Sequence, residues 1–298
     1  MGFFIEVLIG GLLAGVLYSL VALGFVLIFK ASGVFNFAQG AMVLFAALSL
    51  VRMMEVMPFW AAFLLACAIM IALGWAIERI VLRPLVNQEG IILFMATLGI
   101  AFFLDGFGQT IWGSDVYTLE LGVPKGPMFI MESLFDGGVL VDKLDIFAAV
   151  VAGGLVLVLA LFFQKTKTGL ALRAVADDHQ AAQSIGVPLN YIWLIVWSVA
   201  GFVALVAGMV WGAKLGVQFS IALVALKALP VLILGGFTSV PGAIVGGLII
   251  GAGEKISEVY LGPVFGGGIE NWFAYVLALV FLLYRPQGLF GERIIERV

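Results

Sequence analysis

The chain consists of long apolar stretches separated by short polar connections. A helix needs about 20 apolar residues to cross a ~30 Å hydrocarbon core. Because the backbone of a segment in lipid must satisfy its own hydrogen bonds, such stretches are helical, and they lack the alternation of barrel strands. The pattern predicts an all-α polytopic membrane protein with about nine apolar segments, near 5–29, 38–54, 58–78, 91–112, 144–163, 191–213, 221–236, 242–257 and 271–285.

Several of these segments are short for a membrane span. The second, seventh and eighth are candidates for broken or re-entrant helices, so we expect about eight to ten transmembrane helices in total. Lysine and arginine are more frequent in the loops of one side, which places the N-terminus outside and the C-terminus in the cytoplasm. In this orientation the longest outer loop is at about 113–143, and an inner loop is at about 164–190.

The inner loop has the pattern of a short surface helix. Most residues between 170 and 185 favour helix, Gly186 occupies the position expected just after a helix end, and Pro188 prevents continuation. We predict a cytoplasmic helix at about 168–188, with an ordinary connecting helix as the alternative. Its weakly apolar face contains residues at spacings of three and four, namely Leu172, Val175, His179, Ala182 and Gly186.

Composition agrees with a membrane protein and excludes other classes. Hydrophobic residues make up 63% and charged residues 11% of the chain, against about 45–50% and 25% in average globular proteins. The net charge of −3 offers no basic surface for nucleic acid. One cysteine, Cys67, and one histidine, His179, cannot form a four-ligand metal site of the Cys/His type. No GxxxxGK(S/T), GxSxG or HExxH motif occurs, so we predict no enzyme, and ATP-powered transport would need an ATPase on another chain.

Two turns that contain glycine are similar in sequence. FNFAQGAMV at 35–43 resembles FTSVPGAIV at 237–245, and LVAL precedes each of them. Both turns fall on the same membrane side in our orientation, which indicates a possible parallel internal repeat; chance similarity of apolar stretches is the alternative. Asn36 and Gln39 in the first turn carry neutral amides, which can bind a zwitterionic or amide substrate or can simply cap helices.

Glycine pairs and isolated charges also occur in the apolar segments. GxxxG spacing lets helices approach closely, and we expect packing within the chain rather than a dimer face. Lys227 and Asp105 lie inside apolar segments, whereas Glu78 and Glu254 lie near expected helix ends, from where they can reach the interface. Because there are so few ionisable groups in the apolar segments, structural roles are favoured over an ion-coupled relay. The glycine pairs are Gly11/Gly15, Gly208/Gly212, Gly212/Gly216, Gly242/Gly246 and Gly247/Gly251.

Four stretches together resemble a known family. They are YSLVALGFVLIFKASGVFNFAQGAM (18–42), KTKTGLALRAVADDHQAAQSIGV (165–187), ALPVLILGGFTSVPGAIVGGLIIG (228–251) and YRPQGLFG (284–291). They are similar to the membrane permease subunit of ATP-binding-cassette importers for branched-chain amino acids, a family that extends to permeases for urea, short amides and aromatic acids. The resemblance covers the whole chain and implies a single transmembrane permease domain, 1–298, in the bacterial inner membrane.

The resemblance also implies partners and functional residues. The expected partners are a second related permease, two cytoplasmic ATPases that bind the ATP, and a periplasmic binding protein; no cofactor is expected in this chain. The family pattern Glu-Ala-Ala-x-x-x-Gly matches Gln180-Ala181-Ala182 followed by Gly186, except for Gln180 in place of Glu, and the Ile and Leu-Pro that many importers carry downstream are absent. Candidate ATPase-coupling residues are Arg173, Ala174, Asp178, Gln180, Ala181, Ala182 and Gly186. Candidates for the translocation path are Asn36, Phe37, Gln39, Gly40, Thr238, Ser239 and Gly242.

Other functions stay open at this point. A stand-alone facilitator or secondary carrier for small polar solutes would explain the hydrophobicity and the repeat, but would not need the helix at 168–188. A membrane interaction subunit without a transport path is a third hypothesis.

Overall fold

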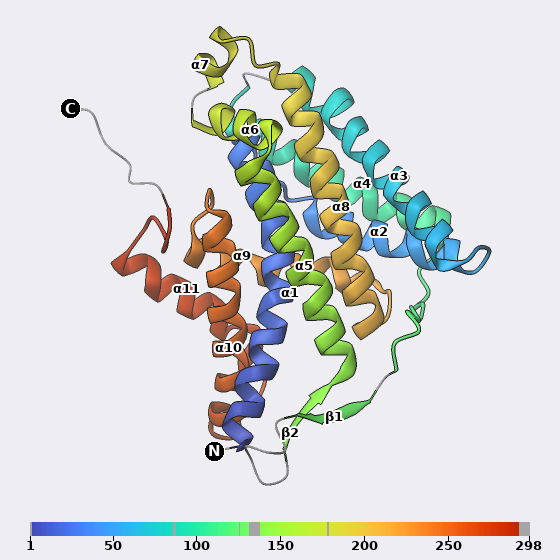
Figure 1. Cartoon of the computed structure of the whole chain (residues 1–298), viewed down its shortest axis with the longest axis vertical. Coiled ribbons are helices and arrows are strands. Elements are labelled where there is room, and N and C mark those ends of the chain that lie inside the picture. The colour runs from blue at the N-terminus through green and yellow to red at the C-terminus, as the bar shows by residue number, and fades with distance from the viewer. Residues whose placement is uncertain (1, 86–87, 125, 131–137, 178, 292–298) are drawn as a thin grey trace. The chain divides into compact units, whose positions relative to one another are not determined.

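The computed structural model describes residues 2–85, 88–124, 126–130, 138–177 and 179–291 (Figure 1). The helices in these ranges are α1 (Gly2–Ser32), α2 (Gln39–Met54), α3 (Phe59–Ala76), α4 (Gly90–Trp112), α5 (Lys143–Lys165), α6 (Lys167–Asp177), α7 (His179–Ser184), α8 (Leu189–Leu215), α9 (Val224–Gly235), α10 (Val240–Phe265) and α11 (Phe273–Tyr284). A π-helical turn (Ile77–Leu82) and a 3-10 turn (Arg83–Leu85) extend α3, and further 3-10 turns precede α9 (Phe219–Leu223) and α11 (Ile269–Asn271).

Six helical segments of the described chain are long and apolar enough to cross a membrane. They are Gly2–Ser32, Phe59–Leu85, Gly90–Trp112, Lys143–Lys165, Leu189–Leu215 and Val240–Phe265. Three shorter apolar helices, Gln39–Met54, Phe219–Gly235 and Phe273–Tyr284, correspond to the second, seventh and ninth predicted segments. Each of the nine predicted segments therefore coincides with an apolar helix.

One expectation about these segments is wrong. The eighth segment was expected to be broken or re-entrant, but it forms part of α10, a continuous helix of 26 residues. The predicted segment contains Glu254 and stopped at 257, directly before Glu258, so it looked short. Both carboxylates have partners within the fold: Lys227 binds Glu254, and Glu258 accepts hydrogen bonds from the backbone N–H groups of Gly268 and Glu270.

The contacts divide the chain into two compact units that interleave along the sequence. We call Leu23–Leu121 with Leu155–Ala225 the central unit, and Met1–Ala22, Gly122–Gly154 with Leu226–Val298 the terminal unit.

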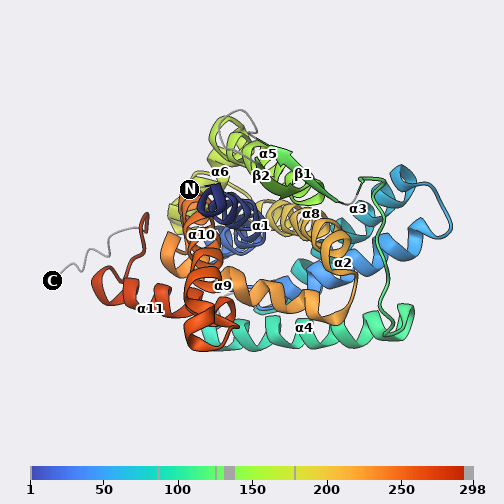
Figure 2. The same ribbon diagram turned by 90° about the horizontal axis from the view of Figure 1, so that it is seen from below.

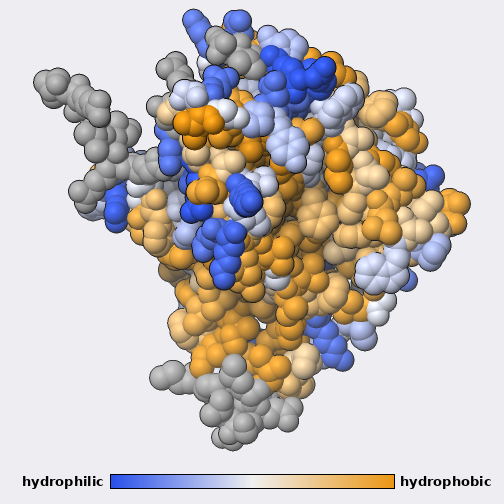
Figure 3. Space-filling model, turned by 45° about the horizontal axis from the view of Figure 1, so that its top comes forward, coloured by the Kyte–Doolittle hydropathy of each residue, from blue (hydrophilic) through white to orange (hydrophobic). Residues whose placement is uncertain are grey.

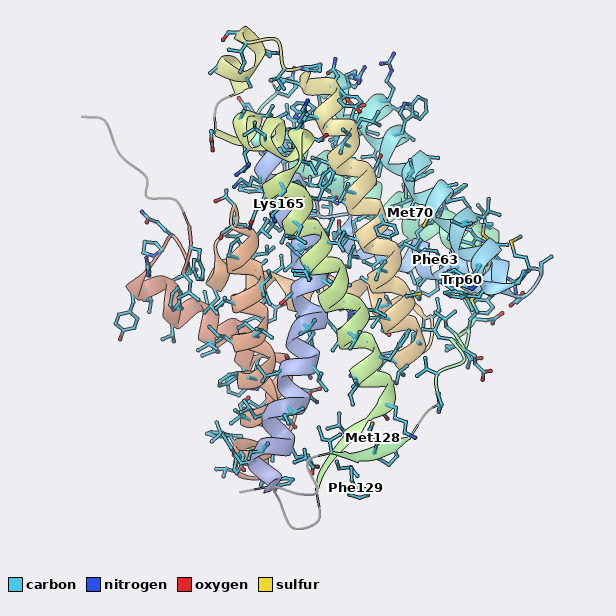
Figure 4. The ribbon with its side chains drawn as sticks, in the orientation of Figure 1. Trp60, Phe63, Met70, Met128, Phe129 and Lys165 are labelled. Atoms are coloured by element: carbon cyan, nitrogen blue, oxygen red, sulfur yellow. The ribbon has the colours of Figure 1, made fainter. Side chains whose placement is uncertain are left out.

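The core of the central unit is built around α2, which lies between α4 on one side and α3 with α8 on the other (Figure 2). Residues 39–51 of α2 are all buried, as expected for a helix that is apolar on every side. Helices α3 and α8 also pack directly. The ring centroids of Phe63 and Phe202 are 6.4 Å apart in an edge-to-face contact, and the backbone of Met70 leaves room only for glycine at position 201. Phe63 and Met70 lie along α3 in Figure 4.

Glycines allow equally close packing in the terminal unit. A Cβ on Gly15 would overlap with the carbonyl group of Gly247, and one on Gly251 would overlap with the backbone of Gly11 and Gly15. The pairs Gly11/Gly15 and Gly247/Gly251 therefore face each other within one chain. In the central unit, Gly208 lies against the backbone of α2. The prediction that such pairs serve packing within the chain is confirmed at these positions.

The predicted outer loop at 113–143 contains a small β-hairpin, so the fold is not purely helical. Strands β1 (Pro127–Ile130) and β2 (Val139–Asp142) are antiparallel, with Pro127 opposite Asp142 and Ile130 opposite Val139. Val139 and Val141 are buried whereas Leu140 is exposed, the alternation of a strand with one covered face. The backbone N–H of Leu140 donates to Glu6.

Large apolar side chains are exposed on several of the long helices. Trp60 on α3, Phe102 on α4 and Val150 on α5 are each at least two-thirds exposed, and apolar side chains cover much of the face seen in Figure 3. Large exposed apolar side chains of this kind are typical of helices that contact a membrane or another protein chain rather than water.

Candidate functional site

The junction between α1 and α2 is closed by buried amide side chains. Asn36 and Gln39 are both completely buried; Asn36 Nδ2 donates to Gln39 Oε1 at 3.1 Å, and Asn36 Oδ1 accepts from the backbone N–H of Ala38 at 3.1 Å. Gln39 Nε2 is buried without a hydrogen-bond partner among the described residues. This nitrogen lies against Gly24, and a Cβ on residue 24 would overlap with it. The amides thus bind each other and the turn, and they are not open to solvent in this conformation.

Aromatic rings and a glycine complete this junction. The Phe37 ring lies 4.6 Å from those of Phe35 and Phe94, centroid to centroid, and the Phe37 backbone N–H donates to Thr97 Oγ1. A Cβ on Gly40 would overlap with the carbonyl oxygen of Ala222, so glycine is required where α2 meets the 3-10 turn before α9. The candidates Asn36, Phe37, Gln39 and Gly40 are therefore brought together in one small region.

The second candidate turn, between α9 and α10, is held mainly by backbone contacts. Ser239 caps α10, because its Oγ accepts from the N–H of Gly242 at 3.0 Å. Gly242 lies directly against Gly235, where a Cβ on either residue would overlap with the carbonyl group of the other. Thr238 is half-buried in the same turn.

The C-terminal segment folds onto the end of α9. The N–H groups of Leu289 and Phe290 donate to the carbonyls of Leu234 and Gly235 at 2.8 and 3.1 Å. These are carbonyls that a helix end leaves without an intrahelical partner. The stretches 228–251 and 284–291, which carried the family resemblance separately, thus form one structure within the terminal unit.

The predicted cytoplasmic helix is present as two helices, α6 and α7, one after the other beyond α5 (Figure 1). Residue Asp178, between them, lies outside the described residues. Leu172, Val175 and Ala182 are buried, which confirms the predicted apolar face for these members. The position of Gly186 after the helix end is confirmed: its φ is +88°, and its N–H donates to Gln183 while the N–H of Val187 donates to Ala182, the bonding of a Schellman helix end.

The remaining coupling candidates lie on these two helices. Arg173 is exposed on α6, where its guanidinium donates to the carbonyl of Gln164 at 3.3 Å, and Ala174 is half-buried beside it. Gln180 and Ala181 are in the first turn of α7. The small side chain of Ala182 faces the protein, whereas Ile185 is 76% exposed at the end of the helix.

A buried cluster of ionisable residues was not predicted. Glu254 was expected near a helix end, but it lies in the middle of α10 and is 2% exposed; Lys227 Nζ binds its Oε1 at 2.6 Å, and Tyr18 Oη donates to the same oxygen at 3.2 Å. Glu78, also expected to reach the interface, is 1% exposed and forms a two-oxygen pair with Arg83. The expectation for Glu254 is wrong, because a carboxylate with such partners can be buried in the middle of a helix. Glu78 does lie close to a helix end, in the turn directly after α3.

Of the residues in the cluster of Tyr18, Lys227 and Glu254, only Lys227 could be recognised from the sequence as a charge that needs a partner. Lys227 stood out as a charge within an apolar segment, which called for a partner, but the sequence could not tell which carboxylate would meet it. A charged residue in an apolar segment does not always have such a partner: Asp105 Oδ1 is buried on α4 without a hydrogen-bond partner among the described residues. No group of three or more metal-ligating side chains occurs among the described residues.

Together, the six long apolar helices and their glycine-mediated packing are typical of a multi-pass membrane protein. The family model described as the permease component of the branched-chain amino acid transport system matches residues 7–284. The chain belongs to this family. It is a permease subunit of the ATP-binding-cassette type, without catalytic activity of its own, and permeases of this type work with ATPase and binding-protein partners.

Individual relatives align over nearly their whole length. The high-affinity branched-chain amino acid transport system permease protein LivH of Salmonella typhimurium is 28% identical over 99% of this chain and 98% of its own. The corresponding protein BraD of Pseudomonas aeruginosa is 29% identical, again over 99% and 98%. A solved structure of PsaBC from Streptococcus pneumoniae in complex with Fab aligns with a TM-score of 0.44 and 14% identity over 92% of this chain and 89% of that chain.

Proposed function

We propose that this chain forms the translocation path of an importer for leucine, isoleucine and valine, or for a related small polar solute. The match of the family model from residue 7 to residue 284 carries this proposal. The curated names of LivH and BraD state branched-chain amino acid transport for those proteins. The absence of a phosphate-binding loop from the sequence fits a subunit whose ATP is bound elsewhere.

The assembly we propose contains one copy of this chain, a second related permease, two cytoplasmic ATPases and a periplasmic binding protein, in the bacterial inner membrane. The N-terminus is periplasmic and the C-terminus cytoplasmic, and the three shorter helices lie in the membrane beside the six long ones. The turns at 35–43 and 237–245 are the corresponding parts of a parallel repeat. Asn36, Phe37, Gln39 and Gly40, with Thr238, Ser239 and Gly242, lie beside the path; because Asn36 and Gln39 are closed off here, a transport role requires their junction to open.

Purification in mild detergent from the native membrane tests the assembly. We expect the tagged chain to bring with it a second permease and chains that contain GxxxxGK(S/T), and the reconstituted complex to take up branched-chain amino acids only with ATP. Recovery of this chain alone, in a form that transports without ATP, would contradict the proposal and favour a stand-alone facilitator.

The α6–α7 segment is proposed to bind the ATPase, with Arg173, Ala174, Asp178, Gln180, Ala181, Ala182 and Gly186 in the coupling surface. Gly186 offers the sharpest test, because its φ of +88° costs an ordinary residue about 1–2 kcal/mol. In Gly186→Val we expect the purified complex to hydrolyse ATP but to lose most of its uptake, since the helix end is displaced. Gly186→Asn is the control, because asparagine tolerates this backbone conformation. Equal uptake by both variants and the wild type would remove Gly186 from the coupling mechanism.

A further inference from the structure

A lysine, a glutamate and a tyrosine meet deep inside the terminal unit. Tyr18 is near the middle of α1, Glu254 is near the middle of α10, and Lys227 is in the first turn of the short helix α9. At 1.5 Å per residue, Tyr18 and Glu254 are about 15 Å or more from either end of their helices. Both helices are long enough to cross a membrane, and Tyr18 and Glu254 lie near the middle of these spanning lengths.

The three side chains leave one strong acceptor unused. Lys227 Nζ and Tyr18 Oη both bind Glu254 Oε1, at 2.6 and 3.2 Å, and Lys227 Nζ also lies 6.0 Å from the centroid of the Tyr18 ring. Glu254 Oε2 is buried and has no hydrogen-bond partner among the described residues. A carboxylate oxygen that is buried without a partner is costly, and ionisable groups at this depth mark substrate pathways in many transporters.

The charges of the cluster match those of an amino acid. Lys227 and Glu254 together are electrically neutral, and so is the zwitterionic head of an amino acid. When Lys227 separates from Glu254, each is left as an unpaired charge in a medium of low dielectric constant, which is strongly unfavourable. An ammonium and a carboxylate inserted between them would replace one ion pair with two and leave no charge unpaired. A solute with a single charge would leave one.

We propose that Lys227 and Glu254 form the intramembrane binding site for the zwitterionic head of the transported amino acid. Lys227 Nζ binds the α-carboxylate, and Glu254 Oε2 binds the α-ammonium. Tyr18 acts as a positioning residue: its hydroxyl holds Oε1, and this leaves Oε2 for the ligand. Lys227 keeps 28% of its side-chain surface exposed, so the ligand approaches from its side. This inference rests on the proposed function and adds the residues that recognise the substrate.

The test uses the full complex, reconstituted in vesicles with ATP and its binding protein, and measures uptake of radiolabelled leucine and stimulated ATP hydrolysis. We expect Lys227→Met and Glu254→Gln each to lower uptake by about tenfold to a hundredfold, the loss expected when a hydrogen bond to a charged group is removed. The key variant is the double Lys227→Met/Glu254→Gln. It leaves no unpaired charge, so it assembles and its ATPase still responds to the binding protein, but uptake stays low.

A matched control lies one residue further along α10. Lys255 pairs with Glu270 at 3.4 Å in an exposed position, and surface pairs contribute little. The double variant Lys255→Gln/Glu270→Gln should therefore transport leucine at the wild-type rate. If uptake by this control falls as far as in Lys227→Met/Glu254→Gln, the loss does not belong to the buried pair and the inference is overturned.

Each remaining outcome is decisive. If the wild-type complex takes up no branched-chain amino acid with ATP, the branched-chain substrate of the proposed function fails and the inference with it. If the wild type transports but the buried double variant recovers wild-type uptake, Lys227 and Glu254 are a structural ion pair and only the inference fails; unaffected single variants lead to the same conclusion. Should the neutral variants not assemble, Lys227→Arg and Glu254→Asp keep both charges but change their spacing. A raised half-saturation concentration for leucine then supports the site, and an unchanged one overturns it.

Discussion

The junction between α1 and α2 and the junction between α9 and α10 have similar sequences but are stabilised differently. Both follow a helix that ends at a glycine with positive φ, +68° at Gly33 and +103° at Gly236, whose N–H donates back into the helix. Both then place a glycine, Gly40 or Gly242, against a backbone carbonyl, where a side chain would not fit. The shared glycines therefore solve the same steric problem in each junction.

Between these glycines the two junctions differ. At 33–40, side chains fill the turn: the Asn36–Gln39 amide pair and a row of phenylalanine rings. At 236–242, glycine backbone lies directly against other backbone, including that of the C-terminal segment at Gly288 and Gly291. The two junctions share an apolar sequence pattern, but polar side chains fill the first turn whereas close glycine contacts hold the second. We call the segment at 33–40 the amide junction and the segment at 236–242, where the backbone contacts are close, the rigid junction.

The largest effect is expected at the rigid junction, from Gly242→Leu. Its new side chain would overlap with the carbonyl group of Gly235, so α9 and α10 would have to separate. Overpacking of this severity costs about 3 kcal/mol, and we expect a large fall in the thermal stability of the detergent-purified complex. Gly10→Leu is the control, since a Cβ there meets no atom within 4 Å. Equal melting temperatures for the two variants would mean that the close contact of α9 with α10 is not required.

A smaller effect is expected at the amide junction, from Asn36→Leu. This change removes the donor to Gln39 Oε1 and the acceptor for the Ala38 N–H, and buried groups left unpaired cost about 1–3 kcal/mol. Gln39→Met, of similar volume, should cost less because it also removes the unpaired Nε2 donor. Thermal unfolding of both variants tests this order, and a greater loss in Gln39→Met would contradict it.

The same two variants separate structure from transport. If the amides take part in the path, uptake by the assembled complex should change in Gln39→Met although its stability is nearly unchanged. Wild-type uptake in both variants would leave Asn36 and Gln39 as parts of the fold alone.

The sequence predicted those features that depend on residues close together along the chain, namely the helices and their ends. The nine apolar helices follow from hydropathy, and the helix end at Gly186 follows from the steric freedom of glycine before Pro188. The hairpin was missed because strands of four residues give too short an alternation to detect. The continuity of α10 was missed because its charged residues are compensated by groups distant in sequence.

Contacts between segments that are distant in the sequence could not be predicted from it. Nothing in the local sequence shows that Lys227 pairs with Glu254 rather than with another carboxylate, or that the N–H groups of Leu289 and Phe290 bind the end of α9. For the same reason the amides of Asn36 and Gln39 were visible as candidates, whereas their mutual hydrogen bond and complete burial were not. The sequence therefore identified candidate residues by their chemistry, but only the tertiary structure shows which of them are in contact.

The smallest effect is expected from Ser239→Ala, which removes a single cap from the rigid junction. The Ser239 hydroxyl accepts from the Gly242 N–H at 3.0 Å, and loss of such a cap costs about 1 kcal/mol. Ser239→Thr keeps the acceptor and should melt with the wild type, whereas Ser239→Ala should melt a few degrees lower and transport normally. Because the contacts of Gly235 and Gly242 remain, the junction should keep its shape. A loss of uptake in Ser239→Ala that Ser239→Thr restores would show that the hydroxyl serves the translocation path, and would overturn the view that this junction is only a rigid support.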